Sequence, residues 1–404
     1  MQADFSSSKT LSKQQVSDVT YTQNFSVTYE FPVVFTEDIF NPNNPTIRDA
    51  LCRIEPMQRH RCLVFVDQGL ADAQQELLDR IKQYAKHHEA SIELVRDPII
   101  VPGGEKIKST LHFVEDMQRA LSDYHIDRHS FTIAIGGGAV LDAVGLVSAV
   151  THRGVRHIRI PTTVLSQNDS GVGVKNAVNQ FGQKNFVGTF APPFAVLNDL
   201  NFALSLGERD KIAGMAEAVK VALIRDRTFY EWLEHNSDHL AIFDRDAMAK
   251  MIRRCAELHM RQIGQGGDPF EAGSARPLDF GHWSAHKLEG LTNYHVRHGE
   301  AVAIGIALDT RYSVLKGLLE PGLDERVCVL LEHIGFRLWH PVLGKTDANG
   351  NLTIVEGLRE FREHLGGELT ITLLQDLGRG IELHEMDTGL VREAIAWLKG
   401  RQEP

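Results

Sequence analysis

Cysteine is scarce in this 404-residue sequence: it occurs only at Cys52, Cys62, Cys255 and Cys328, and no two form a CxxC pair. This spacing excludes a dense disulfide framework and favours free thiols in a reducing cytoplasm. A basic excess is also missing, because the formal net charge is −10 and the pI is near 6.0. No nucleic-acid partner is therefore expected. If an acidic protein binds an anionic ligand, it must concentrate its cations locally.

The sequence also lacks a long, uninterrupted apolar run. Residues 131–150 come closest, but they contain three consecutive glycines, Gly136 to Gly138, and the charged Asp142. We predict a buried strand that leads into a helix, and no membrane partner. The N-terminal residues are polar, so no signal peptide is expected, and residues 1–20 are predicted to form a flexible extension.

Short apolar segments alternate with helical patterns in the first half of the chain. Strands are predicted at residues 20–34 (a strand or hairpin), 63–66, 92–95, 99–101, 131–135 and 158–161. Helices are predicted at 74–88, at 108–124 and directly after Gly138. This alternation predicts a parallel α/β sheet, and we assign residues 21–202 to an α/β, Rossmann-like domain.

The pattern changes after Leu206. Helices are predicted at residues 208–224, 228–235, 245–262, 282–291, 299–315 and 321–334, whereas 369–374 is the clearest β-like stretch. Residues 203–404 are therefore predicted to form a mostly α-helical domain. Ligand sites favour the cleft between two such domains.

A glycine turn suggests a nucleotide cofactor. Gly136-Gly137-Gly138 follows an apolar stretch and precedes a helical pattern, so its backbone can approach a diphosphate. Such turns are also common as purely structural features, and the run is not GxGxxG. Asp67 ends an earlier strand, and Glu105 and Lys108 follow a second glycine pair. Together these residues favour NAD over NADP, because an acid at the ribose disfavours a 2′-phosphate.

Histidines and one glutamate form a candidate metal set. His282 and His286 lie four residues apart in a helical pattern, so they share a face. His298 starts another helix, and Glu217 lies inside the first long helix of the second half. Such ligands from separate helices suit a catalytic divalent metal, with Zn²⁺ as the first choice. The sequence has 19 histidines, so chance pairs at this spacing are expected, and spacing alone favours the structural interpretation.

Cationic and polar side chains gather in and around a loop-rich segment, residues 166–193. The set is Arg153, Asp169, Lys175, Lys184, Asn185 and Lys220. Several donors beside a metal can bind a phosphate and stabilise developing negative charge. Taken one at a time, these side chains fit solvated surface positions equally well.

In this order, the residues resemble 3-dehydroquinate synthase and its relatives, the sugar-phosphate cyclases. The resemblance covers roughly residues 60–375. It rests on Gly136-Gly137-Gly138 through Asp142, Arg153-Gly154, Pro161-Thr162-Thr163, Asp169-Ser170, Lys175, Gly182-Gln183-Lys184-Asn185, Ala216-Glu217-Ala218-Val219-Lys220, Gly281-His282 through His286, and His298-Gly299-Glu300-Ala301.

The resemblance implies roles for individual residues. It implies a divalent metal, Zn²⁺ or Co²⁺, on Glu217, His282 and His298. It implies NAD contacts at Asp67, Glu105, Lys108, Gly137, Gly138, Asp142, Thr162, Thr163 and Lys184. It implies substrate-binding or proton-handling roles for Arg153, Asp169, Lys175, Asn185, Lys220, Glu271 and His286. A homodimer is also expected from the resemblance.

Departures from the dehydroquinate synthase pattern concern the substrate. Where those enzymes carry Arg-x-x-x-Asn-x-Gly-His, this chain has Asp279 in place of the Asn, and Arg276 is shifted by one place. A later Asp-Lys-Lys motif ends here in His364. Asp279 and His364 resemble 2-epi-5-epi-valiolone synthases, whose substrate has no carboxylate, and Asp279 would repel an acid substrate. His286, however, is typical of dehydroquinate synthases.

The resemblance therefore implies a cyclase that converts a seven-carbon ketose phosphate to a carbocycle with loss of phosphate. The steps are transient oxidation by NAD, elimination, reduction and aldol closure, and sedoheptulose 7-phosphate is the first choice of substrate. Three alternatives stay open: 3-dehydroquinate synthesis from 3-deoxy-arabino-heptulosonate 7-phosphate, a polyol dehydrogenase of the glycerol dehydrogenase type, and a non-catalytic scaffold.

Overall fold

The computed structural model describes residues 20–181, 183–270, 277–364 and 367–402. The chain divides into two compact units, Met1–Glu30 and Phe31–Pro404. In the first unit, residues 20–30 form no helix or strand, and Tyr21 and Phe25 are 90% and 83% exposed. The predicted strand or hairpin at 20–34 is therefore wrong except at its last two residues. Alternating side chains do not make a stable strand without a neighbour to complete its hydrogen bonds. The predicted extension, 1–20, lies outside the described residues apart from Thr20.

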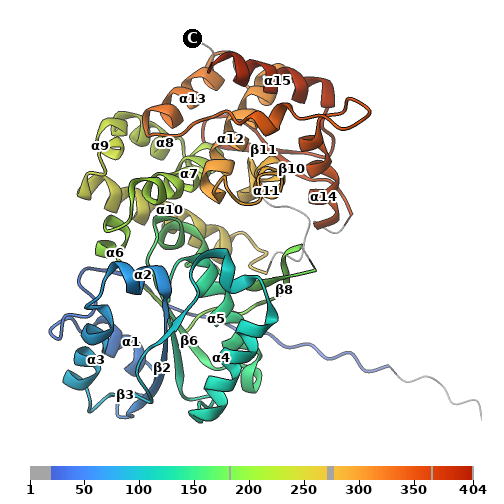
Figure 1. The fold of residues 1–404 in the computed structure, drawn as a ribbon. Coiled ribbons are helices and arrows are strands. Elements are labelled where there is room, and N and C mark those ends of the chain that lie inside the picture. Colours follow the sequence, from blue (N-terminus) through green and yellow to red (C-terminus); the bar gives the residue numbers. More distant parts are fainter. Residues whose placement is uncertain (1–19, 182, 271–276, 365–366, 403–404) are drawn as a thin grey trace, which may run out of the picture. The chain divides into compact units, whose positions relative to one another are not determined.

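A seven-stranded sheet forms the centre of the first half of the second unit (Figure 1). Its strands are β1 (Val33–Thr36), β2 (His60–Asp67), β3 (Ile92–Leu94), β4 (Ile99–Val101), β5 (Phe131–Gly136), β6 (Arg156–Pro161) and β9 (Ala195–Asp199). Their order is β1-β9-β6-β5-β2-β3, and β4 pairs with the end of β2 beyond β3. Every pairing in this sheet is parallel. The predicted parallel α/β architecture is confirmed, although β9 was not foreseen.

Helices cover both faces of the sheet, as Figure 1 shows. They are α1 (Thr46–Cys52), α2 (Gln68–Ala73), α3 (Leu77–His87), α4 (Leu111–Asp123) and α5 (Gly138–Val150). Within β2, Val64 packs with the core of α1 and α3, and Phe65 packs with the core of α4 and α5. Burial on both faces explains why these strands are almost continuously apolar. Residues 131–150 form β5 and α5 as predicted, and no helix among the described residues is long and apolar enough to cross a bilayer.

The carboxyl ends of the central strands meet at one edge of the sheet. Asp67 at the end of β2 lies opposite Val101 of β4, and Gly136 at the end of β5 lies opposite Pro161 of β6. The glycine turn, the loop after β4 and the residues after β6 therefore share this edge. In parallel α/β sheets, this is the edge where ligands bind.

The segment predicted to be loop-rich contains an antiparallel hairpin, β7 (Lys175–Gln180) and β8 (Gln183–Phe190). A short π-helical turn, Ser166–Ser170, precedes it. The prediction failed because the hairpin is polar and largely exposed along β8, so it lacks the apolar signal of a sheet strand. Its base is fixed by Arg159 of β6, whose buried guanidinium donates to Asn176 Oδ1 at 2.7 Å and to the carbonyl of Lys175 at 3.0 Å.

The second half is mostly helical, as predicted. Its helices are α6 (Leu200–Leu204), α7 (Glu208–Arg225), α8 (Arg227–His235), α9 (Ser237–Ala241), α10 (Arg245–Gln265), α11 (His282–Leu291), α12 (His298–Leu315), α13 (Leu323–His333), α14 (Glu356–His364) and α15 (Thr388–Gly400). A small hairpin, β10 (Ile371–Asp376) and β11 (Arg379–Leu383), packs with them. The last strand of the large sheet ends at Asp199, close to the proposed boundary at 202, which itself stays a prediction.

The backbones of helices α7 and α12, and of α12 and the residue before α11, lie in direct contact. A methyl group added at Gly299 of α12 would lie 1.8 Å from the carbonyl oxygen of Ala213 in α7. One added at Gly305 would lie 2.0 Å from the carbonyl oxygen of Gly281, directly before α11. Gly281 itself has a φ of +77°, which glycine adopts without strain. These contacts fix three helices that each carry one candidate metal ligand.

Candidate functional site

Glu217 of α7, His282 of α11 and His298 of α12 lie side by side, although they are far apart in sequence. Nε2 of His298 is 3.6 Å and Nε2 of His282 is 3.8 Å from Oε1 of Glu217. One ligand atom from each residue lies within 4.8 Å of the others. Ligands of a tetrahedral zinc ion are about 3.3 Å apart, given bonds of about 2.0–2.1 Å. The observed spacing is close to that required by a zinc-sized ion.

The orientation of both imidazoles suits metal binding. Nδ1 of His282 is 3.1 Å from the carbonyl oxygen of Phe280, and Nδ1 of His298 is 3.0 Å from Oε2 of Glu289. Both partners only accept hydrogen bonds, so each Nδ1 donates, and each Nε2 is left to face Glu217. Glu217 is fully buried, with Oε2 beside the Lys220 ammonium and Oε1 facing both Nε2 atoms. A buried carboxylate and two Nε2 atoms that face it are a donor set that Zn²⁺ or a similar ion fits once it displaces any proton from Nε2.

Lys220 supplies a positive charge beside this cluster. Its ammonium forms an ion pair with Oε2 of Glu217, one helical turn away. Burial alone would raise the pKa of Glu217, but Lys220 and the two histidines outweigh it and hold the pKa well below its usual range. Burial, followed by Lys220, lowers the pKa of His282 to about 3. For His298 burial acts in the same direction, but Glu217 and Glu289 outweigh it and raise the pKa to about 9.

Asp309 of α12 fixes the start of α11 through two hydrogen bonds. Its buried carboxylate accepts the Gly281 N–H at 3.1 Å and the Trp283 indole N–H at 2.8 Å. These donors flank His282 in sequence, so Asp309 fixes the backbone and side chain on either side of a candidate ligand. Burial raises the pKa of Asp309 to about 7.

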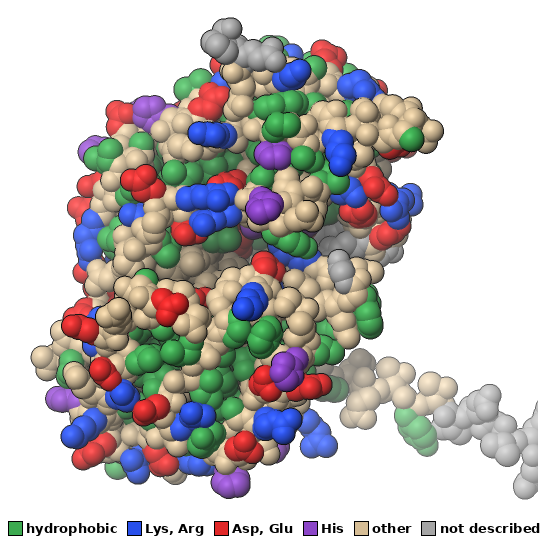
Figure 2. All heavy atoms as spheres, in the orientation of Figure 1, with side chains coloured by type: hydrophobic (Ala, Val, Ile, Leu, Met, Phe, Trp, Pro, Cys, Tyr) green, Lys and Arg blue, Asp and Glu red, His purple; other side chains and the backbone are tan. Residues whose placement is uncertain are grey.

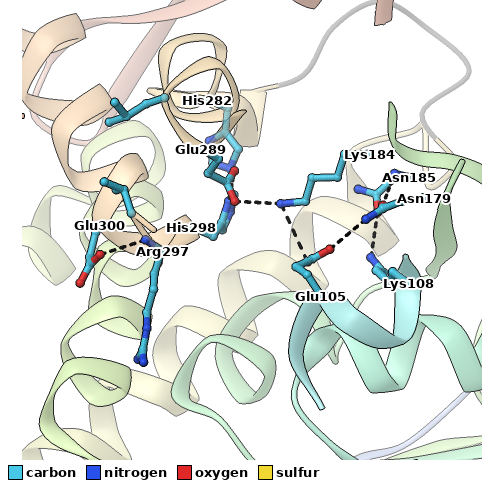
Figure 3. Close-up of polar contacts among 12 residues, drawn as sticks. Glu105, Lys108, Asn179, Lys184, Asn185, His282, Glu289, Arg297, His298 and Glu300 are labelled. Atoms are coloured by element: carbon cyan, nitrogen blue, oxygen red, sulfur yellow. Dashed lines mark hydrogen bonds and ion pairs between the residues drawn. The ribbon is translucent and has the colours of Figure 1, made fainter. Parts of the chain in front are cut away.

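A line of alternating charges leads from the cluster to the α/β half (Figure 3). Nζ of Lys184 in β8 lies 2.9 Å from Oε1 of Glu289 and 3.9 Å from Oε1 of Glu105. Glu105 also accepts a hydrogen bond from Nδ2 of Asn179 at 3.2 Å. The hairpin therefore connects the loop after β4 with the helix that carries His282.

The predicted cofactor residues fall into two neighbouring groups. In one, Nζ of Lys108 donates to Asp142 at 2.6 Å and to Oδ1 of Asn185 at 2.8 Å (Figure 3). The other lies at the carboxyl edge of the sheet, where glycines make room for polar neighbours. A methyl at Gly103 would lie 2.6 Å from Oδ1 of Asp67, and one at Gly137 would lie 3.2 Å from Thr163.

Gly138 and Thr162 belong to the second group as well. A methyl at Gly138 would lie 2.6 Å from the Ser170 hydroxyl, and the Thr162 N–H donates to the Gly136 carbonyl at 3.0 Å. Glu105 and Lys184 connect this edge to the helical half. The predicted cofactor residues thus lie in these two groups and in the contact between Glu105 and Lys184.

Only part of the predicted substrate set lies at the metal cluster. Asp169 lies there, and the charges of Asp169 and Asp279 both act on Lys220. The ring of His286 is 5.4 Å from that of His282 and 5.9 Å from that of His298, centre to centre. The His286 side chain is exposed.

Other predicted substrate residues are placed differently. Asn185 contacts Lys108, and Lys175 begins β7 with an exposed side chain. Arg153 follows the far end of α5, whose 13 residues span about 20 Å from Gly138. Glu271 and the side chain of His364 lie outside the described part of the chain.

Two residues at the site escaped the sequence analysis. Nε2 of His259 in α10 lies 3.1 Å from Oδ1 of Asp169, while its Nδ1 lies 3.0 Å from the carbonyl of Cys255. Glu289 supports His298, as described above. Glu289 could have been found, because it lies seven residues after His282 on the same helical face. His259 had no comparable signal, because only the tertiary fold places it beside Asp169.

Charge on the surface does not mark this site. On the face drawn in Figure 2, acidic and basic side chains are interspersed and do not form a single basic field. Two lysines of the predicted site are buried: Lys220 lies beside Glu217, and Lys108 lies beside Asp142.

The first part of this protein is a parallel sheet with a glycine turn at its carboxyl edge. The second part consists of helices that carry a Glu–His–His cluster. The protein is thus a two-part α/β protein with a candidate metal centre. Family models agree with this class. The model of the 3-dehydroquinate synthase N-terminal domain matches residues 98–213, and that of the C-terminal domain matches residues 214–355. Together they cover more than half of the chain, which therefore belongs to the 3-dehydroquinate synthase family.

Solved structures share this fold. The 2-epi-5-epi-valiolone synthase of Streptomyces hygroscopicus subsp. jinggangensis 5008, with NAD⁺ and Zn²⁺ bound, is 24% identical with a TM-score of 0.83, over 94% of this chain and 100% of that chain. A 2-deoxy-scyllo-inosose synthase with carbaglucose-6-phosphate, NAD⁺ and Co²⁺ is 24% identical with a TM-score of 0.73, over 90% and 96%. A probable glycerol dehydrogenase from Sinorhizobium meliloti 1021 is 15% identical with a TM-score of 0.58, over 93% and 99%.

Proposed function

We propose that this protein is a sugar-phosphate cyclase that uses NAD and a divalent metal, with Zn²⁺ as the first choice and Co²⁺ as a substitute. The observation that carries the proposal is the buried cluster of Glu217, His282 and His298, with Lys220 at its side. A metal cluster alone would also suit a dehydrogenase. A buried ammonium beside the cluster adds a site for an anionic oxygen, as a phosphorylated substrate requires.

The cofactor assignment rests on the carboxyl edge of the sheet. Asp67 lies beside Gly103 and Gly136, where a ribose and a diphosphate can approach the backbone. Its side chain also accepts the Leu70 N–H at 3.2 Å, which fixes the carboxylate at the start of α2. Two structural neighbours, the valiolone and inosose synthases, hold NAD⁺ together with Zn²⁺ or Co²⁺. We assign the same pair of cofactors to this chain.

When bound, the metal supplies a Lewis acid for a substrate hydroxyl, and NAD accepts and returns a hydride. The side chains of this protein orient the substrate and handle its protons. Lys220 donates hydrogen bonds from a site that excludes water, which strengthens its attraction to a developing anion. His286 lies beside the cluster, and a neutral imidazole has one unprotonated ring nitrogen that can accept a proton.

Sedoheptulose 7-phosphate is the proposed substrate, because its reacting end carries no carboxylate. Asp279 lies close enough to Lys220 to act on its charge, so it places a negative charge beside the substrate region. A carboxylate at this point would repel an acid substrate. His286 is the residue that keeps 3-dehydroquinate synthesis as the second candidate, since that family's histidine at this position acts on the substrate.

The test supplies NAD and Zn²⁺ with sedoheptulose 7-phosphate, 3-deoxy-arabino-heptulosonate 7-phosphate or glycerol, and measures phosphate release and net NADH. We expect phosphate from the first substrate with no net NADH. Phosphate from the keto acid alone would establish 3-dehydroquinate synthesis, net NADH from glycerol would establish a dehydrogenase, and no product at all would favour a scaffold. Glu217→Gln is the control: if it keeps both metal and turnover, the metal site is assigned wrongly.

A further inference from the structure

Glu289 lies between a candidate metal ligand and the hairpin of the other half. It is buried near the end of α11, and each of its carboxylate oxygens has one partner. Oε2 lies 3.0 Å from Nδ1 of His298, and Oε1 lies 2.9 Å from Nζ of Lys184 in β8. Figure 3 shows the three side chains in line.

These contacts fix the orientation of the His298 ring. Because a carboxylate only accepts, Nδ1 of His298 donates to Glu289 and Nε2 faces Glu217. Rotation of the ring would break the contact with Glu289 and leave a buried carboxylate with one partner fewer, which is unfavourable. The start of α12 is fixed as well, because Glu300 accepts the Arg297 N–H at 2.9 Å (Figure 3). The ring and the backbone of His298 are thus restrained independently.

Lys184 restrains Glu289 in turn. Without its ammonium, Glu289 would keep a single partner and could rotate away from Nδ1 of His298. Lys184 is also within 3.9 Å of Glu105, in the loop after β4. The hairpin lysine therefore has a carboxylate from each half of the protein beside it.

We propose that Glu289 is a positioning residue that fixes His298 for metal binding, and that Lys184 acts through it, so that the metal affinity of the Glu217–His282–His298 cluster depends on the β7–β8 hairpin. The proposal rests on the metal-binding part of the proposed function. Carboxylates that orient a metal-ligating histidine are known to raise metal affinity about 10- to 100-fold. Coupling of this kind is reciprocal: a ligand that draws Lys184 away from Glu289 weakens the metal, and the metal weakens that ligand equally.

The experiment measures the Zn²⁺ dissociation constant of the full chain by competition with a chromophoric chelator, and the visible spectrum of the Co²⁺ form. Glu289→Gln should weaken Zn²⁺ binding about 10- to 100-fold and change the Co²⁺ spectrum. Lys184→Met should weaken it about tenfold or less, and Lys184→Arg should restore it. If Lys184 acts through Glu289, the double variant binds Zn²⁺ as weakly as Glu289→Gln alone.

Lys287 provides the matched control. It lies on the same helix but pairs with Glu356 and Glu360 of α14, so Lys287→Met should leave Zn²⁺ affinity within about twofold. Because Lys184 is partly exposed, its variants should fold, and they test the proposal even if Glu289→Gln does not fold. An unchanged affinity and Co²⁺ spectrum in Glu289→Gln, or full additivity in the double variant, would overturn the proposal. If Glu217→Gln also keeps its Zn²⁺ affinity, the metal site of the proposed function fails instead.

Discussion

Removal of the charge on Glu217 should destabilise the metal-free protein as well as its metal site. Glu217 is 0% and Lys220 is 2% exposed, and their side chains form an ion pair. Glu217→Gln leaves the buried ammonium without its main counter-charge, and loss of one partner of a buried pair costs about 3–5 kcal/mol. Asp169 and Asp279 also act on Lys220. We therefore expect the lower end, about 3 kcal/mol.

The double variant Glu217→Gln/Lys220→Met separates the charge from the shape of the site. It removes both charges and keeps two side chains of similar volume, so it should recover most of the lost stability and still fail to bind metal. The free energy of unfolding is measured by urea denaturation at pH 7 in the presence of a chelator, with far-UV circular dichroism as the signal.

An exposed pair gives the reference for this comparison. Glu356 and Arg359 have the same spacing, but both side chains are about half exposed, so Glu356→Gln should change the stability by less than about 0.5 kcal/mol. The reasoning is refuted if Glu217→Gln is no more destabilising than this reference. It is equally refuted if the double variant is as unstable as the single one.

Two further perturbations test the scaffold of the site. The pKa of Asp309 is about 7 in the folded state, against about 3.9 unfolded, so its stabilising contribution is complete below about pH 4 and is lost as pH rises through 7. Urea titrations should show the wild-type stability falling by up to roughly 4 kcal/mol relative to Asp309→Asn over this range, and a constant difference would contradict the raised pKa. Gly299→Ala would place a methyl 1.8 Å from the Ala213 carbonyl and should lower the melting temperature, whereas Gly290→Ala, which meets nothing within 4 Å, should stabilise α11 by up to about 1 kcal/mol. Equal melting temperatures for these two variants would argue against the close packing.

The sequence predicted regular elements where the apolar pattern reflects burial. Residues 282–291 were predicted as a helix and form α11 residue for residue. The central strands were recognised because burial on both faces makes them apolar. The hairpin β7–β8 was missed because its strands are polar. Residues 20–32 were assigned to a strand because their side chains alternate, but they form none, because they have no neighbouring strand to pair with.

The candidate site was predictable only to the extent that a family pattern exists. Spacing could relate His282 to His286 on one helix, but it could not relate either to Glu217, because that proximity depends on how α7 and α11 pack. The sequence analysis did not single out His259, which was found through its contact with Asp169. Homodimerisation, a cytoplasmic location and the role of Arg153 stay predictions.

Mutations are tolerated less well in the packed metal cluster than at the periphery of this site. The three candidate metal ligands stand on helices whose backbones touch at Gly299 and Gly305, so almost any side-chain replacement at these glycines disturbs the whole cluster. Asp279, by contrast, ends a short 3₁₀ turn, and Lys175 begins β7 with an exposed side chain. Such peripheral positions tolerate exchange far better than a packed interior. A lineage with this architecture can therefore acquire new substrates by varying these peripheral positions while the proposed metal cluster stays intact.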